Sequence, residues 1–357
     1  MIESFVVDTR QSTTVAPSPP LLRVCQASVR FPTEKTWFGA TSGYLQAVAG
    51  VSLELRAGET LGLVGESGCG KSTLSRAIAG LTPLHGGEVY YKDERIDDLN
   101  DHARQAYRRK MQLVFQDPFA SLNPRQTVAQ IITEPMTIFG LHPPRERLLQ
   151  ALRLLELVGL NPRSLNRYPH EFSGGQRQRI GIARALAAEP EVLILDEPVS
   201  ALDVSIQAQV INLLEDLQRQ LGLAYLFIAH DLSVIRHLSD RVAVMYLGRV
   251  VETAPVEELF AQPRHPYTQA LLAAIPVPDP IVARLRRRQR PPVGGELPSE
   301  GNRPSGCAFA ERCPLADLEC LKSVPPLVGE KHATACFKVA GEDGLSLERA
   351  AIEFPAR

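Results

Sequence analysis

The chain has 357 residues, of which 39 are Lys or Arg and 40 are Asp or Glu, so its formal net charge is −1 at pH 7. This balance gives no overall electrostatic argument for binding nucleic acid. Hydrophobic residues make up 44% of the chain, yet no apolar run approaches the about 18 residues that a transmembrane helix needs. The length suffices for one large or two modest domains with a substantial core.

The first 20 residues lack a basic start followed by an apolar core, so they do not resemble a secretory signal. Their Ser, Thr and Pro content predicts a flexible leader over residues 1–20. Residues 21–55 alternate apolar and polar side chains, which predicts strands with one buried face. Within them Trp37, Phe38 and Tyr44 are candidates to stack on an adenine ring, with packing against the protein as the alternative; Tyr44 is our choice.

A glycine-rich loop lies between a predicted strand, Thr60–Val64, and a predicted helix from Leu74. It reads Gly65-Glu66-Ser67-Gly68-Cys69-Gly70-Lys71-Ser72-Thr73 and fits the pattern G-x-x-x-x-G-K-[ST]. Its glycines can adopt backbone angles that turn N–H groups toward a phosphate, and the following helix points its positive end there. Lys71 is expected to reach the β- and γ-phosphates and Ser72 to bind Mg²⁺. A chance glycine turn is the alternative.

Gln116 ends a further apolar strand, and the following residues, about 117–180, are predicted to form a mostly helical insert. Within the insert, apolar residues from Glu146 to Gly159 recur at helical spacing. The segment Ser173-Gly174-Gly175-Gln176 opens the next helix and is a candidate second anion site. A simple first-turn cap would have the same sequence.

Two apolar runs end in ionisable residues. Val192–Asp196 is followed by Glu197, and Ala224–Ala229 is followed by His230. Such runs are typical of parallel strands buried on both faces, whose C-terminal ends carry ligand-binding residues in α/β proteins. Asp196 suits Mg²⁺ coordination, Glu197 suits polarisation of an attacking water, and His230 is a catalytic candidate. Solvated side chains at strand ends are the alternative.

Together these segments resemble the nucleotide-binding subunits of ABC transporters. The resemblance covers about residues 22–276 and implies an α/β P-loop NTPase fold: a mainly parallel sheet with helices, an antiparallel β-subdomain and a helical subdomain. It implies that residues 65–73 are the Walker A motif, Gln116 the Q-loop, Ser173–Gln176 the signature motif and Val192–Asp196 Walker B. Glu197 is then the catalytic glutamate, residues 200–203 the D-loop and His230 the switch histidine. The implied cassette spans residues 21–262.

The same resemblance implies partners. Two ATP-binding subunits close head to tail, so that Ser173–Gln176 of one subunit contacts the ATP of the other; a paralogous partner is expected. Two membrane permease subunits and an extracytoplasmic peptide-binding protein complete such an importer, with this chain on the cytoplasmic face of the plasma membrane. Soluble ABC ATPases that act on nucleic acid or ribosomes are the alternative. A single cassette, a short helical insert and near-zero net charge argue against nucleic acid as a partner.

The C-terminal residues, 263–357, are predicted to form an extension. The segment His265-Pro266-Tyr267-Thr268, together with residues 114–124, resembles dipeptide and oligopeptide importer ATPases. Nickel and other small-solute importers share parts of this pattern, so they remain alternative functions. The expected reaction is therefore MgATP hydrolysis coupled to the uptake of dipeptides or oligopeptides.

Four cysteines gather in the extension, at Cys307, Cys313, Cys320 and Cys336. In a cytosolic chain such clustering favours a metal over disulfides. The spacings differ from the C-x₂-C pairs of common zinc modules. Four thiolates can hold a [4Fe–4S] cluster, which the family's extension is implied to carry. Zn²⁺, or no metal at all, is the alternative.

Overall fold

The computed structural model describes residues 19–32, 43–117, 121–275 and 304–339. Of the sequence predictions, the flexible leader up to residue 18, Trp37 and Phe38 lie outside these ranges, as do residues 340–357 of the predicted extension.

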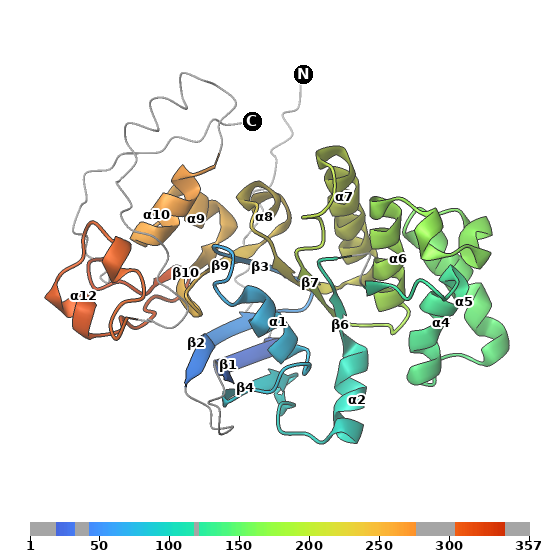
Figure 1. Ribbon diagram of the computed structural model, residues 1–357, viewed down its shortest axis with the longest axis horizontal. Coiled ribbons are helices and arrows are strands. Elements are labelled where there is room, and N and C mark those ends of the chain that lie inside the picture. Colours follow the sequence, from blue (N-terminus) through green and yellow to red (C-terminus); the bar gives the residue numbers. More distant parts are fainter. Residues whose placement is uncertain (1–18, 33–42, 118–120, 276–303, 340–357) are drawn as a thin grey trace, which may run out of the picture.

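A seven-stranded sheet forms the centre of the molecule, in the order β11–β10–β9–β3–β8–β7–β6 (Figure 1). The bounds are β6 Met111–Val114, β7 Val192–Asp196, β8 Ala224–Ile228, β3 Thr60–Val64, β9 Arg241–Tyr246, β10 Arg249–Pro255 and β11 Ala333–Thr334. Pairing is parallel from β6 to β9, whereas β10 and β11 are added antiparallel at one edge. The sheet is therefore mainly parallel, as predicted.

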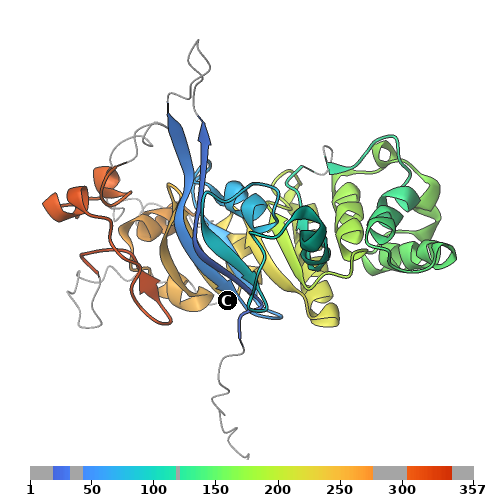
Figure 2. The same ribbon diagram turned by 90° about the horizontal axis from the view of Figure 1, so that it is seen from below.

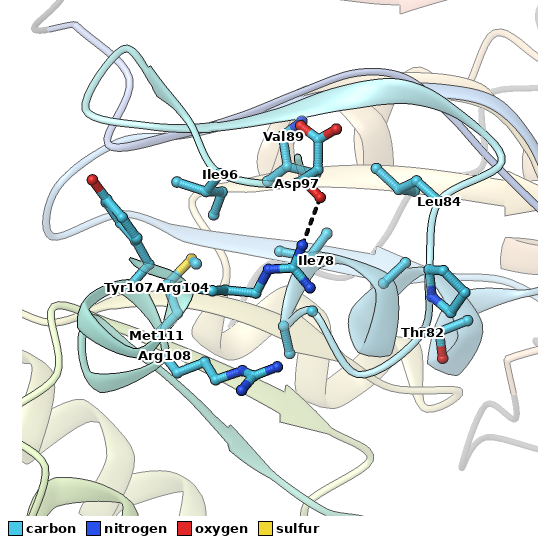
Figure 3. A pocket seen from close by; sticks show the side chains of 14 residues that line it. Ile78, Thr82, Leu84, Val89, Ile96, Asp97, Arg104, Tyr107, Arg108 and Met111 are labelled. Carbon is cyan, nitrogen blue, oxygen red and sulfur yellow. Dashed lines mark hydrogen bonds between the residues drawn. The ribbon is translucent and has the colours of Figure 1, made fainter. Parts of the chain in front are cut away.

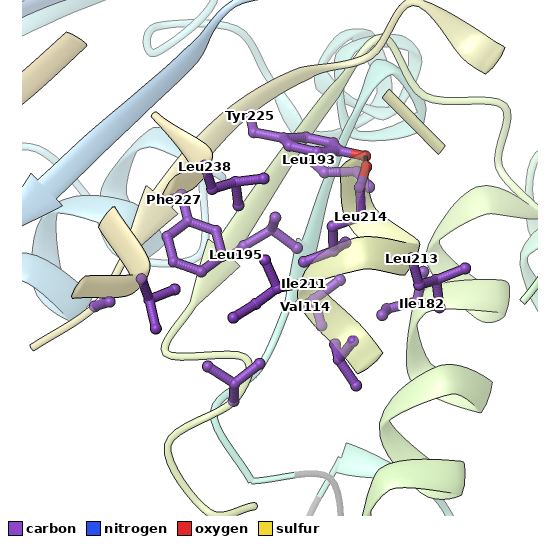
Figure 4. Close-up of a cluster of buried hydrophobic side chains, with 14 of the residues drawn as sticks. Val114, Ile182, Leu193, Leu195, Ile211, Leu213, Leu214, Tyr225, Phe227 and Leu238 are labelled. Carbon is purple, nitrogen blue, oxygen red and sulfur yellow. Dashed lines mark hydrogen bonds between the residues drawn. The ribbon is translucent and has the colours of Figure 1, made fainter. Parts of the chain in front are cut away.

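The sheet separates two hydrophobic cores. Every residue of β3, β7 and β8 is buried, which explains their uninterrupted apolar sequences. Alternate residues of β7 enter opposite cores: Leu193 and Leu195 face one, Val192 and Ile194 the other. Figure 4 shows the first core, where Leu193 and Leu195 lie among side chains of neighbouring strands and helices. The buried strands β7 and β8 end next to the predicted catalytic residues Glu197 and His230.

A second sheet is four-stranded and antiparallel, in the order β2–β1–β4–β5. Its strands are β1 Leu22–Pro32, β2 Tyr44–Leu55, β4 Gly86–Tyr91 and β5 Glu94–Arg95. Figure 2 shows the long β1–β2 pair crossing the middle of the molecule. Buried residues of this sheet, including Leu22 and Leu55, share the second core with Leu74 of helix α1 (Lys71–Ile78). This packing fixes the helix that follows the glycine-rich loop.

Helices form a lobe at one end of the molecule (Figures 1 and 2). They are α4 Val128–Ile138, α5 Pro144–Leu157, the short 3₁₀ turns η1 Pro162–Asn166 and η2 Pro169–Glu171, and the start of α6 Gly174–Leu186. Leu155 and Val158 are fully buried, but Leu148 and Leu149 are 51% and 56% exposed. Helical spacing therefore located α5 but did not tell which of its leucines face solvent.

The remaining helices flank the central sheet. They are α2 Asp101–Lys110, α7 Val204–Leu221, α8 Leu232–Leu238, α9 Val256–Ala261, α10 Pro266–Ala273, η3 Ala310–Arg312 and α12 Leu318–Lys322. We call residues 304–339 the C-terminal segment. Its strand β11 pairs with β10, and Ala335 N–H donates to the Val251 carbonyl at 2.8 Å. The C-terminal segment thus contributes a two-residue strand to the edge of the central sheet.

Candidate nucleotide-binding site

The loop between β3 and α1 has the backbone that its glycines predict. Gly65, Gly68 and Gly70 have φ angles of 155°, 79° and 104°. A Cβ on Gly65 would come within 2.1 Å of the Met245 carbonyl oxygen, so a side chain is excluded there by contact as well as by conformation. Helix α1 begins after Gly70 without a side-chain cap. Its first N–H groups therefore remain available to an anion.

Lys71 folds back across this loop. Its Nζ donates to the carbonyl oxygens of Gly65 at 2.8 Å and Glu66 at 3.0 Å, and the residue is only 4% exposed. Cys69 is buried beside it, with Sγ 3.7 Å from Nζ. Burial raises the pKa of the Cys69 thiol, so this cysteine fills space as a neutral group. The ammonium group is thereby held where phosphate oxygens would enter the loop.

Asp196 meets Ser72 at the end of β7. The Ser72 hydroxyl donates to Oδ1 at 2.9 Å and the Ser75 hydroxyl to Oδ2 at 3.3 Å. Asp196 is 3% exposed, and this burial raises its pKa against the opposing effect of the Ser72 hydrogen bond. A carboxylate beside a hydroxyl, both oxygen ligands, fits a Mg²⁺ ion. Ser75 was not predicted, although it lies one helical turn beyond Ser72.

Gln116, Glu197 and His230 come together from three strand ends. Gln116 Nε2 donates to Glu197 Oε2 at 2.8 Å, and His230 Nδ1 lies 3.4 Å from the same oxygen. Glu197 adopts a left-handed backbone with φ 49°, and its N–H donates to the Ile228 carbonyl at 2.9 Å. This turn directs its carboxylate away from the strand. The three predicted residues are thus neighbours next to Asp196.

Ser173–Gln176 lie elsewhere, at the start of α6 on the helical lobe. Ser173 and Gln176 are exposed and form a capping box, in which each side chain accepts from the other residue's N–H. The structural alternative, a first-turn cap, is therefore present. Gly175 packs so closely on α7 that a Cβ would come within 2.3 Å of Ile206. Among the described residues, no hydrogen bond joins this segment to the glycine-rich loop.

Tyr44 begins β2 and is 59% exposed. The Arg30 guanidinium lies 5.0 Å from its ring centre, so the ring already has one stacking partner. Its free face is accessible to solvent, which is compatible with the predicted contact to adenine.

A cavity of about 140 Å³ lies near the opposite end of α1 from the loop (Figure 3). Its walls include Ile78, Tyr107 and Met111, and Arg104 crosses it to donate to the Asp97 carbonyl at 2.7 Å. Ligand pockets usually enclose at least about 300 Å³. This cavity is therefore too small for a nucleotide and does not compete with the loop.

Two residues that reach the loop were not predicted to do so. The Tyr267 hydroxyl accepts the N–H of Glu66 at 2.9 Å, and Arg312 forms an ion pair with the Glu66 side chain at 2.9 Å. The His-Pro-Tyr segment singles out Tyr267 only through its family resemblance. No local pattern connects Arg312 with a loop 246 residues away.

The four cysteines of the C-terminal segment are free thiols, of which Cys320 and Cys336 are buried. The pKa of Cys307 is raised to about 11, chiefly by burial and to a lesser extent by Cys320, Cys336 and Cys313 nearby. Within the described residues, no group of three or more His, Cys, Asp or Glu side chains is arranged to hold a metal ion. The predicted metal site is thus not found among the described residues.

The described residues include no helix with the length and apolar character needed to cross a bilayer.

Comparisons with known proteins agree with this geometry. The family model "ABC transporter" matches residues 48–200, and the model "Oligopeptide/dipeptide transporter, C-terminal region" matches residues 251–320. The chain is 51% identical to the oligopeptide transport ATP-binding protein OppF of Escherichia coli (strain K12), over 89% of this chain and 96% of that protein. It is 50% identical to the oligopeptide transport ATP-binding protein AppF of Bacillus subtilis (strain 168), over 90% of this chain and 98% of that protein.

A solved structure is similar as well. It is the dimeric, post-hydrolysis state of the ATP-binding cassette MJ0796 bound to ADP and Pi, with a TM-score of 0.59 and 29% identity. The match covers 66% of this chain and 98% of that one. The fold around the glycine-rich loop is therefore that of an ATP-binding cassette.

Proposed function

The chain belongs to the ABC transporter family of ATP-binding subunits, and from this premise we propose that it is the ATPase of a peptide importer. It hydrolyses MgATP, and the hydrolysis drives uptake of dipeptides or oligopeptides through a membrane permease. The proposal rests on two hydrogen bonds to consecutive acids. Ser72, which follows the phosphate loop, donates to Asp196, and Gln116 donates to Glu197. The peptide substrate is supported by the oligopeptide transport proteins that match nearly their full length.

Each residue of the site has one proposed role. Lys71 and the loop N–H groups bind the phosphates, and Tyr44 stacks on the adenine ring. Ser72, Gln116 and Asp196 hold Mg²⁺, which when bound offsets the charge of the phosphate oxygens. Glu197 accepts a proton from the attacking water, and His230, within reach of the same carboxylate, contacts the γ-phosphate.

The exposed start of α6 is proposed to serve a second ATP-binding subunit. Ser173, Gly174, Gly175 and Gln176 face solvent or the adjacent α7 rather than the phosphate loop of their own chain. A helix start that is exposed in this way can bind the phosphates of a partner's nucleotide. The complete assembly then has two ATPase subunits, identical or paralogous, two permease subunits and an extracytoplasmic peptide-binding protein, with this chain at the cytoplasmic face of the membrane.

The cysteines of the C-terminal segment are proposed to bind a [4Fe–4S] cluster. Such a cluster takes one thiolate at each of four corners, so its ligands surround it rather than converge on one atom. Neighbouring cysteines, Cys320 among them, contribute to the raised pKa values of Cys307, Cys313 and Cys336, although burial is the largest cause. This contribution supports the arrangement, since it requires the four side chains to lie near one another.

Anaerobic purification tests the cluster. We expect brown protein that contains iron, and colourless protein when Cys313 and Cys320 are both changed to Ser. Cys25→Ser is the matched control, because Cys25 lies on β1 and should not affect the colour. Colourless wild-type protein that contains one zinc per chain would establish Zn²⁺ instead.

The importer function is tested with the chain assembled with its permease subunits in vesicles. We expect ATP hydrolysis that depends on Mg²⁺ and is accompanied by uptake of a labelled oligopeptide when the binding protein is present. Lys71→Ala should abolish both by removing the charge that binds phosphate. Hydrolysis with uptake of nickel but not of peptide would change the substrate class, and hydrolysis stimulated only by nucleic acid would refute the importer.

A further inference from the structure

We propose that Arg312 and Tyr267 are positioning residues for ATP: they hold Glu66 of the phosphate loop, so nucleotide affinity depends on residues outside the cassette motifs. The inference rests on the proposed ATPase function. It concerns a contact between the C-terminal residues and the loop, to which neither the motifs nor the matched families assign a role.

Glu66 is held at three of its groups. Its carboxylate forms a two-pronged contact with Arg312, from Nη1 to Oε2 at 2.9 Å and from Nη2 to Oε1 at 3.2 Å. Its N–H donates to the Tyr267 hydroxyl at 2.9 Å. Its carbonyl accepts from Lys71 Nζ at 3.0 Å, the ammonium group expected to bind phosphate. A shift of Glu66 would therefore also move the carbonyl oxygen that accepts the hydrogen bond from Lys71.

Arg312 is itself fixed in place. Its side chain is 14% exposed, its Nη1 lies 3.3 Å from the Tyr246 hydroxyl, and the rings of Tyr246 and Phe309 lie 5.7 Å from its guanidinium carbon. The hydrogen bonds that Arg312 donates to Glu66 raise the pKa of Arg312 above its usual range. Paired contacts of this type between Arg and a carboxylate are among the strongest and most directional hydrogen bonds in proteins.

Tyr267 is equally well anchored, because it is 1% exposed and packs on Tyr246 with ring centres 4.5 Å apart. Burial raises the pKa of its hydroxyl, which stays neutral and can accept the Glu66 N–H. The three aromatic rings of Tyr246, Tyr267 and Phe309 form one cluster beneath the loop. Arg312 and Tyr267 thus act on Glu66 from one rigid support.

The consequence for ATP is electrostatic and conformational. A carboxylate in the phosphate loop repels the triphosphate unless it is neutralised, and Arg312 provides that neutralisation. The loop also contains three glycines with positive φ. Fixing Glu66 reduces the number of loop conformations, so less conformational entropy is lost when the nucleotide binds. Packing of the C-terminal residues without any effect on nucleotide binding is the opposing interpretation.

Binding of the fluorescent nucleotide TNP-ATP, with Mg²⁺, to the full-length chain distinguishes the two. We expect Arg312→Ala to weaken binding about tenfold, which corresponds to roughly 1.4 kcal/mol. Adding Glu66→Gln to Arg312→Ala should restore most of the affinity, because it removes the unpaired charge. The loss in Arg312→Ala should be larger at low salt than at high salt. Tyr267→Phe, which removes only the hydroxyl, should weaken binding by about threefold.

Lys338→Ala is the matched control. It breaks an ion pair with Asp317 in the same C-terminal segment, away from the loop, and should leave affinity unchanged. In the assembled transporter, Arg312→Ala should raise KM for ATP while kcat stays near that of the wild type.

The outcomes distinguish the proposed ATPase function from the positioning role of Arg312. Failure of the wild-type chain to bind TNP-ATP would refute the proposed function itself. Binding by the wild type and equally tight binding by Arg312→Ala would refute the positioning role alone. Weak binding by Arg312→Ala that Glu66→Gln does not restore would show that Arg312 only supports the fold, and would also overturn the proposal.

Discussion

At the scale of single residues, the site depends on how burial and hydrogen bonding treat each ionisable group. Asp196 is buried, and this raises its pKa, while two hydroxyl groups donate to its carboxylate. Glu197 is more accessible, at 16% side-chain exposure, and its carboxylate is shared by Gln116 and His230. The two adjacent acids therefore occupy different environments, with Asp196 enclosed by hydroxyl donors and Glu197 partly accessible to solvent.

Glu197→Gln tests whether Glu197 accepts the proton of the attacking water. The amide keeps the shape and the contact with Gln116 but cannot take a proton from water, so kcat should fall at least about 100-fold. Binding of TNP-ATP should remain within about twofold of the wild type, since no phosphate contact is removed. Glu257→Gln on α9, whose side chain is 76% exposed, should retain full hydrolysis. Rapid turnover by Glu197→Gln would assign the proton transfer to another group.

At the scale of elements, the two helices that begin in glycine-rich segments differ in their N-terminal capping. Helix α1 has no side-chain cap after Gly70, whereas α6 begins with the capping box of Ser173 and Gln176. Side-chain oxygens in a cap satisfy N–H groups that would otherwise be free. This difference favours α1 as the primary phosphate site of the chain and leaves α6 as an exposed, already ordered surface.

Helix α10 supplies a prediction on pH. His265 caps it, accepting the Tyr267 N–H at 3.0 Å, and burial lowers the pKa of His265 to about 4 from 6.5. The unfolded chain then binds a proton between these values that the folded chain does not, so stability is lost as pH falls from about 6.5 to 4. His265→Asn keeps a cap but cannot titrate, and should reduce this loss by up to about 3 kcal/mol.

Urea unfolding at several pH values measures the effect. His265→Asn is expected to be less stable than the wild type at pH 7, because it is smaller in a buried position, but to show a flatter pH dependence. His102→Asn, on the exposed face of α2, should keep the wild-type pH dependence. Equal slopes for the wild type and His265→Asn would show that other groups cause the loss.

At the scale of the whole molecule, the proposed function assigns the chain two halves of two different ATP sites. The phosphate loop lies at the centre of the molecule, and the start of α6 lies on the helical lobe (Figure 1). This separation agrees with the proposal that a nucleotide held by one chain contacts the signature segment of a second subunit. Hydrolysis would then be linked to the approach and separation of two chains.

Association of two ATPase subunits is expected to depend both on the nucleotide held by the phosphate loop and on the signature segment. The Glu197→Gln chain, alone or mixed with a second ATPase subunit of its transporter, should sediment as a pair when MgATP is added. Ser173→Arg should prevent pairing while leaving TNP-ATP binding intact, because the added side chain fills the partner's phosphate site. Thr127→Arg, which disrupts the similar capping box of α4, is the matched control and should still pair. Pairing by the Ser173→Arg chain would exclude the signature segment from the interface.

The sequence by itself determined which segments would carry the candidate site, because the motifs that mark them are short and local. The glycines and Lys71 lie in one short loop. Asp196 ends the buried strand β7, Glu197 follows it, and His230 comes two residues after the buried strand β8. Parallel strands bring such ends to one edge, so the expected neighbours follow from the pattern alone. The cysteine spacing, by contrast, indicated a metal site for which the described residues show no arranged group of ligands, so the cluster stands as a proposal.

Only the tertiary structure decided which distant residues meet. The pairing of β11 with β10 brings the C-terminal segment onto the central sheet, and Arg312 then reaches Glu66 across 246 positions of sequence. Neither residue belongs to a repeating pattern, and the contact depends on a cluster of aromatic rings from three separate elements. Local sequence carries no signal for such a contact, since its energy arises only when the chain has folded.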